Sequence, residues 1–143
     1  MFKKKTKINF EKYKTDVPII KFSLTDSSVY FAIVDTGSES TVMDEKFVKD
    51  NAELFQIASR HTMSLIGVSG GSVHTVEHVS ATFVFENRRC MISGITSDLS
   101  ELNKSACAFC DCELNISVII GCDTLTQLGS IIDFNDKEIK VKL

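Results

Sequence analysis

Short runs of apolar and β-branched residues alternate with clusters of turn-forming residues along most of the chain. This pattern predicts β-strands joined by tight turns and hairpins. The predicted strands span 19–24, 29–34, 41–43, 63–66, 73–79, 81–85, 90–96, 116–120, 131–134 and 139–143. Strands at such close spacing predict a single all-β, barrel-like domain.

Two brief helices are expected between the strands. They are predicted to span 45–49 and 124–128. Asp44 and Asp123 precede them as N-cap residues, and Gly129 ends the second helix. In the first helix, Phe47 and Val48 are expected to face inward. Helices this short leave the all-β class unchanged.

Residues 97–115 break the strand pattern, because they are polar at first and then rich in cysteine. An irregular stretch of this length is long for a compact domain, so we expect an insertion that has a role of its own or is mobile. The chain shows no internal repeat and no second domain. We therefore divide it into a basic N-terminal arm, residues 1–16, and one domain, residues 17–143, which contains the insertion.

Charge is unevenly distributed over the 143 residues. Residues 1–14 hold six lysines and one glutamate, whereas the whole chain has a net charge of −3, so the remainder is acidic. This balance argues against nucleic-acid binding, and no apolar run reaches the roughly 18 residues of a membrane-spanning helix. No apolar segment follows the lysines as in a secretory signal, so we expect a cytoplasmic protein. The basic arm is either a solvated terminus or a contact for an acidic surface of the same or another protein.

The stretch 32–38, Ala-Ile-Val-Asp-Thr-Gly-Ser, carries the first chemical signal. Its apolar strand leads directly into Asp35 and is expected to place this residue near the core, where an unpaired carboxylate is costly. The backbone amides of Gly37 and Ser38 are the nearest donors in the following turn. At this point Asp35 is either a functional acid or the cap of a strand-ending turn.

A second apolar strand, residues 116–120, ends in Gly121. Such a glycine suits a strand that crosses closely behind another one, because it has no side chain to obstruct the approach. The same residues equally fit a core strand followed by a capped helix. The order of the two motifs along the chain is more informative than either motif alone.

The sequence contains, in order, an apolar strand into Asp-Thr-Gly-Ser, then Ser-Thr-Val-Met, a glycine-rich hairpin, Ile-Ile-Gly-x-Asp-x-Leu-x-x-Leu-Gly and Ile-Ile-Asp-Phe. This order resembles the retroviral-type aspartic proteases, or retropepsins. The resemblance covers residues 17–96 and 116–143 and is strongest at 34–43 and 119–134. It implies the acid protease fold, a closed β-barrel with one or two short helices and a flap hairpin.

The resemblance also implies roles for individual residues. Asp35 matches the catalytic aspartate, of which each subunit of a homodimer supplies one. Thr36 matches the residue that bonds to the backbone of the other subunit, and Gly37 matches the residue whose carbonyl holds the substrate. The flap that closes over a peptide corresponds to Gly67, Val68, Ser69, Gly70 and Gly71. The strand packed behind the active-site loop corresponds to Ile119, Ile120 and Gly121.

These assignments predict an aspartic endopeptidase that cleaves extended peptides without a cofactor. Two Asp35 carboxylates about 3 Å apart across the dimer share one proton, because both cannot be ionised at that distance. The pair activates a water molecule and polarises the scissile carbonyl. Ser38 is placed to donate a hydrogen bond to the carboxylate, which predicts an acid-shifted pH optimum. Asp123 is not expected to be a second catalytic acid, because Leu125 stands where that motif needs glycine.

Three features depart from the retropepsin pattern. Cys122 stands where the family often has a basic residue, so Glu39 lacks its presumed partner. The insertion at 97–115 has no counterpart, and the basic arm precedes the usual start. The last two features leave the chemistry intact but affect the dimer contacts, because the chain ends often form the subunit interface in this family.

The cysteines allow further interpretations. Cys107, Cys110 and Cys112 lie within six residues, and they hold zinc only together with a fourth ligand such as Cys90 or Cys122. Otherwise they form a redox-sensitive loop or are ordinary reduced thiols. Reduced thiols are the default expectation, so no metal site is predicted.

Two alternatives to a simple protease remain open. In the first, the chain is a peptide-binding or dimerisation module with little turnover, because a fold does not determine a function. In the second, it is a protease whose activity is regulated by redox chemistry or by a metal at the Cys107–Cys112 loop. His74 and His78 are expected to face solvent beside the glycine-rich hairpin, with His74 alternatively tuning flap closure with pH.

Overall fold

The computed structural model describes residues 5–13, 17–25, 27–64, 73–110 and 114–143, of which 61–64, 73–75 and 106–110 by their backbone alone. The strands are β1 (Lys5–Asn9), β2 (Ile19–Ser23), β3 (Val29–Val34), β4 (Val42–Asp44), β5 (Gln56–Ser64), β6 (Val73–Phe85), β7 (Arg88–Ser97), β8 (Ile116–Ile120), β9 (Ile131–Asp133) and β10 (Glu138–Lys142). The helices are α1 (Glu45–Asp50), α2 (Ser100–Cys110) and α3 (Cys122–Gln127), with a 3₁₀ turn at Ala52–Leu54. No helix in these ranges is long and apolar enough to span a membrane.

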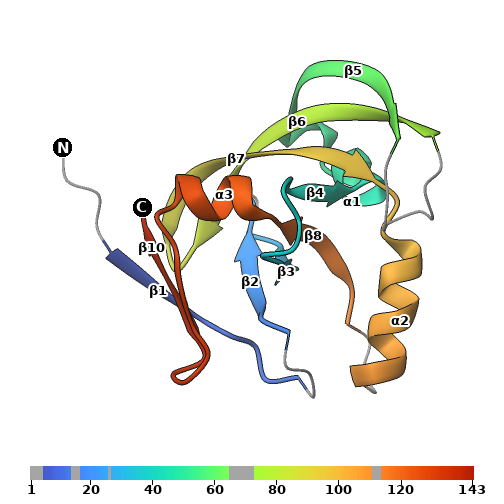
Figure 1. Ribbon diagram of the computed structural model, residues 1–143. Coiled ribbons are helices and arrows are strands. Elements are labelled where there is room, and N and C mark those ends of the chain that lie inside the picture. The colour runs from blue at the N-terminus through green and yellow to red at the C-terminus, as the bar shows by residue number, and fades with distance from the viewer. Residues whose placement is uncertain (1–4, 14–16, 26, 65–72, 111–113) are drawn as a thin grey trace.

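Six strands form a closed barrel in the order β2-β3-β8-β4-β7-β6, and a contact between β6 and β2 closes it (Figure 1). β8 lies between β3, to which it is parallel, and β4, to which it is antiparallel. β5 pairs with β6 outside the closed ring, so the β5–β6 hairpin arches over the barrel (Figure 1). The prediction of an all-β closed barrel is thereby confirmed.

Aromatic side chains fill much of the barrel interior. Phe22 of β2 stacks on Phe83 of β6 with ring centroids 4.5 Å apart. Phe47 of α1 packs edge-on against Phe22, with ring centroids 5.9 Å apart. Phe47 and Val48 are both buried, which confirms the predicted inward face of the first helix.

A second sheet, with the order β1-β10-β9, lies beside the barrel. All five residues of β1 pair with β10 in antiparallel register. Ile8 is 2% exposed and belongs to the main core cluster, and the Lys7 ammonium lies 4.0 Å from the Glu138 carboxylate. Residues 5–9 of the arm are therefore an anchored strand rather than a solvated terminus, because Ile8 contributes to the core.

Helix α2 lies within 97–115, where the pattern predicted an irregular loop. The Asp98 carboxylate accepts a hydrogen bond from the Ser100 amide at 2.9 Å, and Leu99 is fully buried. The Asn103 side chain bonds to both backbone groups of Ile116 at the start of β8, at 2.6 and 3.0 Å. The loop prediction was wrong because these contacts with the barrel stabilise a helix that the local pattern does not reveal.

Asp44 precedes α1 as predicted, but it makes no capping hydrogen bond. Its carboxylate instead accepts a hydrogen bond from the Leu99 amide at 3.0 Å. The predicted helix is confirmed and its predicted cap is wrong. Asp44 links the start of α1 to the segment that leads into α2.

Candidate active site

Asp35 directly follows β3, where this strand lies beside β8. Its amide donates a hydrogen bond to the Ile120 carbonyl at 2.9 Å, so the pairing of the two strands continues to Asp35. Val34 is buried in the core, and successive side chains of a strand point to opposite faces. Asp35 therefore points outward, and it is exposed in the protomer. The expectation of a carboxylate near the core was wrong for this reason.

The turn after Asp35 orients its carboxylate. The Gly37 amide donates a hydrogen bond to Asp35 Oδ1 at 2.9 Å, as expected. The Ser38 amide instead donates to the main-chain carbonyl of Asp35 at 3.2 Å, and the Ser38 hydroxyl donates to the Ser40 carbonyl at 2.7 Å. Ser38 thus gives its two donors to backbone oxygens and does not support the predicted acid-shifted pH optimum.

The junction of β8 and α3 supports this turn from behind. A Cβ atom on Gly121 would lie 2.5 Å from the Ser40 carbonyl oxygen and 2.7 Å from the Ser38 carbonyl oxygen, closer than real Cβ atoms come. The Cys122 amide donates to the Ser38 carbonyl at 2.7 Å. Glycine at this position therefore lets two backbone segments touch.

A buried hydrogen-bond network joins the far end of the turn to α3. Its centre is Thr41, which is fully buried. The Thr41 amide and hydroxyl donate to the two carboxylate oxygens of Asp123 at 3.1 and 2.7 Å. The Thr41 hydroxyl oxygen also lies 2.6 Å from the Thr124 hydroxyl and accepts a bond from the Gly121 amide at 3.1 Å. The network fixes the position of the turn relative to the helix.

The same network corrects the predicted cap of α3. Gly121 occupies the N-cap position, and Asp123 lies within the first turn of the helix. The Asp123 carboxylate is directed across to Thr41 because that residue offers two donors at once. Sequence reasoning missed Thr41 and Thr124 as parts of the site. The available signals were a threonine directly before the strand at Val42 and a second threonine directly after Asp123.

Cys122 makes a second contact with the turn. Its thiol donates a hydrogen bond to the Thr36 carbonyl at 3.0 Å, and the residue is partly buried. Cys90 is partly buried against the main core, and neither cysteine forms a disulfide. The zinc and redox alternatives depend on residues 107–112, whose side chains lie outside the described part of the chain.

The predicted flap, Gly67 to Gly71, also lies outside the described residues. β5 and β6 pair as far as Ser64 and Val73, which flank that segment. The His74 side chain is not among those described. His78 is partly buried and lines a hollow of about 300 Å³ together with Thr41 and Asp123, so the prediction that it faces solvent holds only in part.

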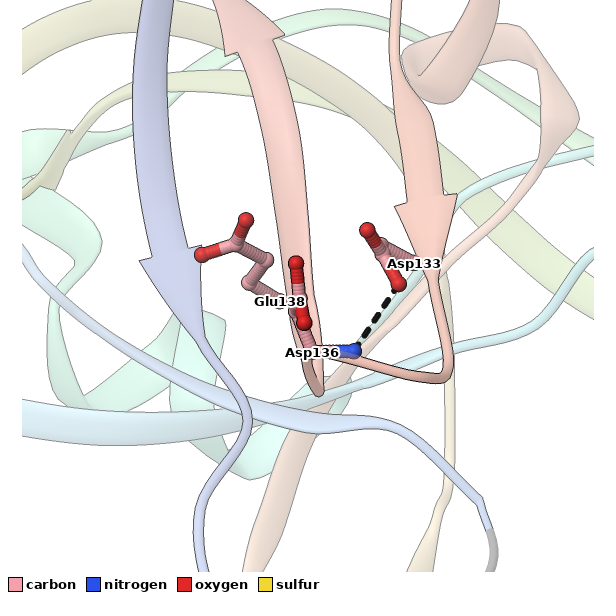
Figure 2. Close-up of side chains that lie close together, drawn as sticks. All are labelled: Asp133, Asp136 and Glu138. Atoms are coloured by element: carbon pink, nitrogen blue, oxygen red, sulfur yellow. Dashed lines mark hydrogen bonds between the residues drawn. The ribbon is translucent and has the colours of Figure 1, made fainter.

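Three carboxylates gather at the turn between β9 and β10: those of Asp133, Asp136 and Glu138, with their oxygens within 4.8 Å of one another (Figure 2). The Asp136 amide donates to Asp133 Oδ1 at 2.9 Å. The Lys140 ammonium lies 3.9 Å from the Asp133 carboxylate and 3.8 Å from the Glu138 carboxylate. Backbone amides and the Lys140 ammonium therefore offset part of the negative charge of this cluster.

Comparison with known proteins relates this barrel to solved structures of the retropepsin type. No protein-family model and no curated protein matches the chain. The retroviral protease-like domain of Ddi1 from Leishmania major is similar in structure, with a TM-score of 0.57 and 13% identity over 87% of each chain. A retropepsin-like aspartic protease from Rickettsia conorii gives a TM-score of 0.51 and 12% identity over 96% of this chain and 90% of that chain. The similarity inferred from the order of the motifs is confirmed in three dimensions, and the chain has the retropepsin-like fold.

Proposed function

We propose that the protein is an aspartic endopeptidase that acts as a homodimer, with one Asp35 from each copy in the active site. The observation that carries this proposal is the exposed Asp35 carboxylate at the end of a core strand of a retropepsin-like barrel. The Gly37 amide orients this carboxylate at 2.9 Å. An exposed acid on a firmly held turn is suited to chemistry, whereas a fold-stabilising acid would be occupied by several donors.

Asp123 illustrates that contrast. Its carboxylate accepts hydrogen bonds from the Thr41 amide, the Thr41 hydroxyl and the Thr124 amide, at 2.7 to 3.1 Å. These bonds leave Asp123 in a structural role, so it does not serve as the second acid of the same chain. The partner of Asp35 in the proposed mechanism is therefore Asp35 of a second copy, related by a two-fold axis.

The paired carboxylates hold one proton between them and titrate as a unit. The ionised member takes a proton from a water molecule, whose oxygen attacks the carbonyl carbon of the scissile bond. The protonated member gives its proton to the carbonyl oxygen, and a neutral tetrahedral diol results. As the carbon–nitrogen bond breaks, one diol hydroxyl returns a proton to the second carboxylate, and the first protonates the leaving nitrogen.

The substrate in this proposal is an extended peptide that lies as an additional strand across the two copies. Main-chain hydrogen bonds hold it, and the segment 67–71 covers it and excludes water. Thr36 is assigned to contacts between the two copies, and Gly37 to the substrate backbone. The exposed position of both residues beside Asp35 supports these assignments.

The decisive variant is Asp35→Asn, because asparagine keeps the size of the side chain and an oxygen for the Gly37 amide. We expect cleavage of a peptide library to fall by at least about a thousandfold at every pH tested. Asp50→Asn is the matched control, since it removes an exposed carboxylate that pairs with Lys46. Cleavage by Asp35→Asn at the wild-type rate would refute the enzyme proposal, and tight peptide binding without cleavage by the wild type would favour a binding module.

Mixing the two proteins tests the dimer separately. When wild type and Asp35→Asn are present in equal amounts and exchange subunits freely, about a quarter of the dimers hold two aspartates. Activity at constant total protein concentration is then expected to fall to about a quarter. A fall to about one half would show that each copy works alone, which contradicts the paired mechanism.

A further inference from the structure

Positive charge is concentrated on the outer face of the β1-β10-β9 sheet. Ile8 and Val141 are 2% and 1% exposed and point into the core. Because side chains alternate along a strand, every second residue of β1 and of β10 points away from the core. These outward positions hold four lysines, which we call the lysine face: Lys5, Lys7, Lys140 and Lys142.

The strand register places like charges directly opposite each other. Lys5 pairs with Lys142, and Lys7 pairs with Lys140. Directly opposed like charges destabilise a sheet. Lysine on an edge strand such as β1 commonly protects against aggregation, but this does not explain the lysines of β10, which is the central strand. The two opposed pairs therefore have a cost for which packing and edge protection do not account.

Acidic side chains offset the charge at one end of the lysine face. The Glu138 carboxylate lies 3.8 Å from the Lys140 ammonium and 4.0 Å from the Lys7 ammonium. At the other end, neither Lys5 nor Lys142 forms an ion pair with a carboxylate among the residues that the structure describes. The pair of Lys5 and Lys142 is therefore the more strongly positive of the two.

The stem of Lys142 is held in place although the residue is exposed. Its amide donates a hydrogen bond to the Leu128 carbonyl at 2.7 Å, where α3 ends. Its Cδ atom lies 3.2 Å from the position that a Cβ atom on Gly129 would take, so the stem packs over this glycine. A side chain whose stem is already packed loses less conformational freedom when it binds a partner.

The surroundings of the lysine face favour a polypeptide as its partner. Ile131 pairs with Lys140 and is 59% exposed, so a large apolar side chain lies beside the lysines. The carboxylates of Asp133 and Glu138 lie at the same end of the face. A nucleic acid or an anionic membrane presents continuous negative charge, which these two carboxylates and the net charge of −3 oppose. A polypeptide segment instead combines a few acidic residues with an apolar one.

We infer that the lysine face binds an acidic segment of a polypeptide, which lies extended over β1 and β10. Each opposed lysine pair brings two ammonium groups to one carboxylate, because opposed Cβ atoms are only about 5 Å apart. The two pairs are two residues apart along the strands, or about 7 Å. Carboxylates at every second residue of an extended segment have the same spacing, so they meet both pairs. The bound carboxylates offset the repulsion between the opposed lysines.

The test measures binding of a fluorescently labelled peptide that alternates glutamate and threonine, by anisotropy at low ionic strength. A second peptide has the same composition with its glutamates in one block, and we expect it to bind more weakly. The double variant Lys5→Gln/Lys142→Gln is expected to lower the affinity for the alternating peptide about tenfold, because two exposed charge pairs are lost. Lys21→Gln/Lys49→Gln is the matched control, since it removes the same charge from exposed positions elsewhere and is expected to keep the affinity.

Urea unfolding of the same variants separates binding from folding. Lys5→Gln/Lys142→Gln is expected to be at least as stable as wild type, because opposed like charges are removed. A loss of affinity no larger than that of the control variant would overturn the inference, whatever the stability.

Two further outcomes would also overturn it. Equal affinity for the alternating and the block peptide would show general charge attraction rather than a built site. Vesicles of phosphatidylserine and phosphatidylcholine in equal parts, or single-stranded DNA, are offered in place of the peptide. Tighter binding of either one, lost in Lys5→Gln/Lys142→Gln, would make the partner a membrane or a nucleic acid. None of these measurements depends on cleavage, so their outcome leaves the proposed function as it is.

Discussion

The buried hydroxyl of Thr41 allows a quantitative test of how the turn that follows Asp35 is held. Thr41→Val replaces this hydroxyl by a methyl group of similar size, so it removes hydrogen bonds without opening a cavity. The hydroxyl has three partners: Asp123 Oδ1 at 2.7 Å, the Thr124 hydroxyl at 2.6 Å and the Gly121 amide at 3.1 Å. The variant leaves each of these partners without its bond to Thr41.

The three partners differ in what the loss costs. Asp123 is an exposed residue, so its carboxylate regains water and contributes little. Gly121 and Thr124 are buried, and a buried polar group without a partner costs about 1–3 kcal/mol. We therefore expect Thr41→Val to lower the free energy of unfolding by about 2–6 kcal/mol, with two groups affected. This is a large part of the roughly 5–15 kcal/mol by which a domain is stable.

Urea unfolding followed by circular dichroism measures this difference, with Thr41→Ser as the matched control. Serine keeps the hydroxyl and loses one methyl group, at a cost of about 1 kcal/mol. Because the lost hydrogen bonds outweigh the methyl group, valine is expected to be clearly more destabilising than serine, although valine preserves more apolar surface. A valine variant as stable as the serine variant, or more stable, would refute this role of the hydroxyl.

Two further predictions concern the backbone contact behind the turn and the acidic cluster. Gly121→Ala places a Cβ atom 2.5 Å from the Ser40 carbonyl oxygen, so we expect a loss of about 1–3 kcal/mol in urea unfolding; wild-type stability would contradict the contact. The Asp136 amide, together with the Lys140 ammonium, holds the pKa of Asp133 below its ordinary value of 3.8. Because the folded-state pKa is the lower one, the charged carboxylate stabilises the fold above pH 3.8, and this contribution is lost as the pH falls through the folded-state pKa. Asp133→Asn is therefore expected to be less stable than wild type at neutral pH, with a difference that shrinks in acid; a difference independent of pH would contradict this reasoning.

The strands were predictable because their pattern is local. Apolar runs between turn residues place the hairpin of β2 and β3 and that of β9 and β10 correctly, and Gly129 ends α3 with a positive φ of 55° as expected. The position of Asp35 at the end of a core strand follows from the same pattern. Its exposure does not follow from that pattern. Asp35 faces outward because the pairing of β3 with β8 continues as far as this residue, and the sequence does not reveal where that pairing ends.

The errors concern polar side chains whose partners are far away in sequence. Asp44 bonds to an amide 55 residues later, and Asp123 bonds to Thr41, 82 residues earlier. Asp44 and Asp123 each had a plausible local role as a helix cap. Each carboxylate instead accepts a hydrogen bond from a donor that is distant in the sequence. Ser38 is a different case, because its hydroxyl is taken by a local partner, the Ser40 carbonyl, instead of the Asp35 carboxylate.

Helix α2 and strand β1 were missed for a related reason. In each case a small number of side chains, Leu99 and Asn103 for the helix and Ile8 for the strand, attach the segment to the barrel. The lysines around Ile8 suggested a solvated terminus, and the polar and then cysteine-rich composition of 97–115 suggested an irregular loop. Tertiary contacts of single residues outweighed the composition of the whole segment.

The seam of the barrel has a consequence for solubility. β2 and β6 pair at a single position, Ser23 with Val84, whereas β6 and β7 pair at eight. Closure therefore depends on the stacked rings of Phe22 and Phe83 more than on backbone bonds. If these rings separated, the ring of strands would open into a curled sheet whose free margins attract other chains. The aromatic pair thus protects the molecule from aggregation through exposed strand edges, in addition to occupying its interior.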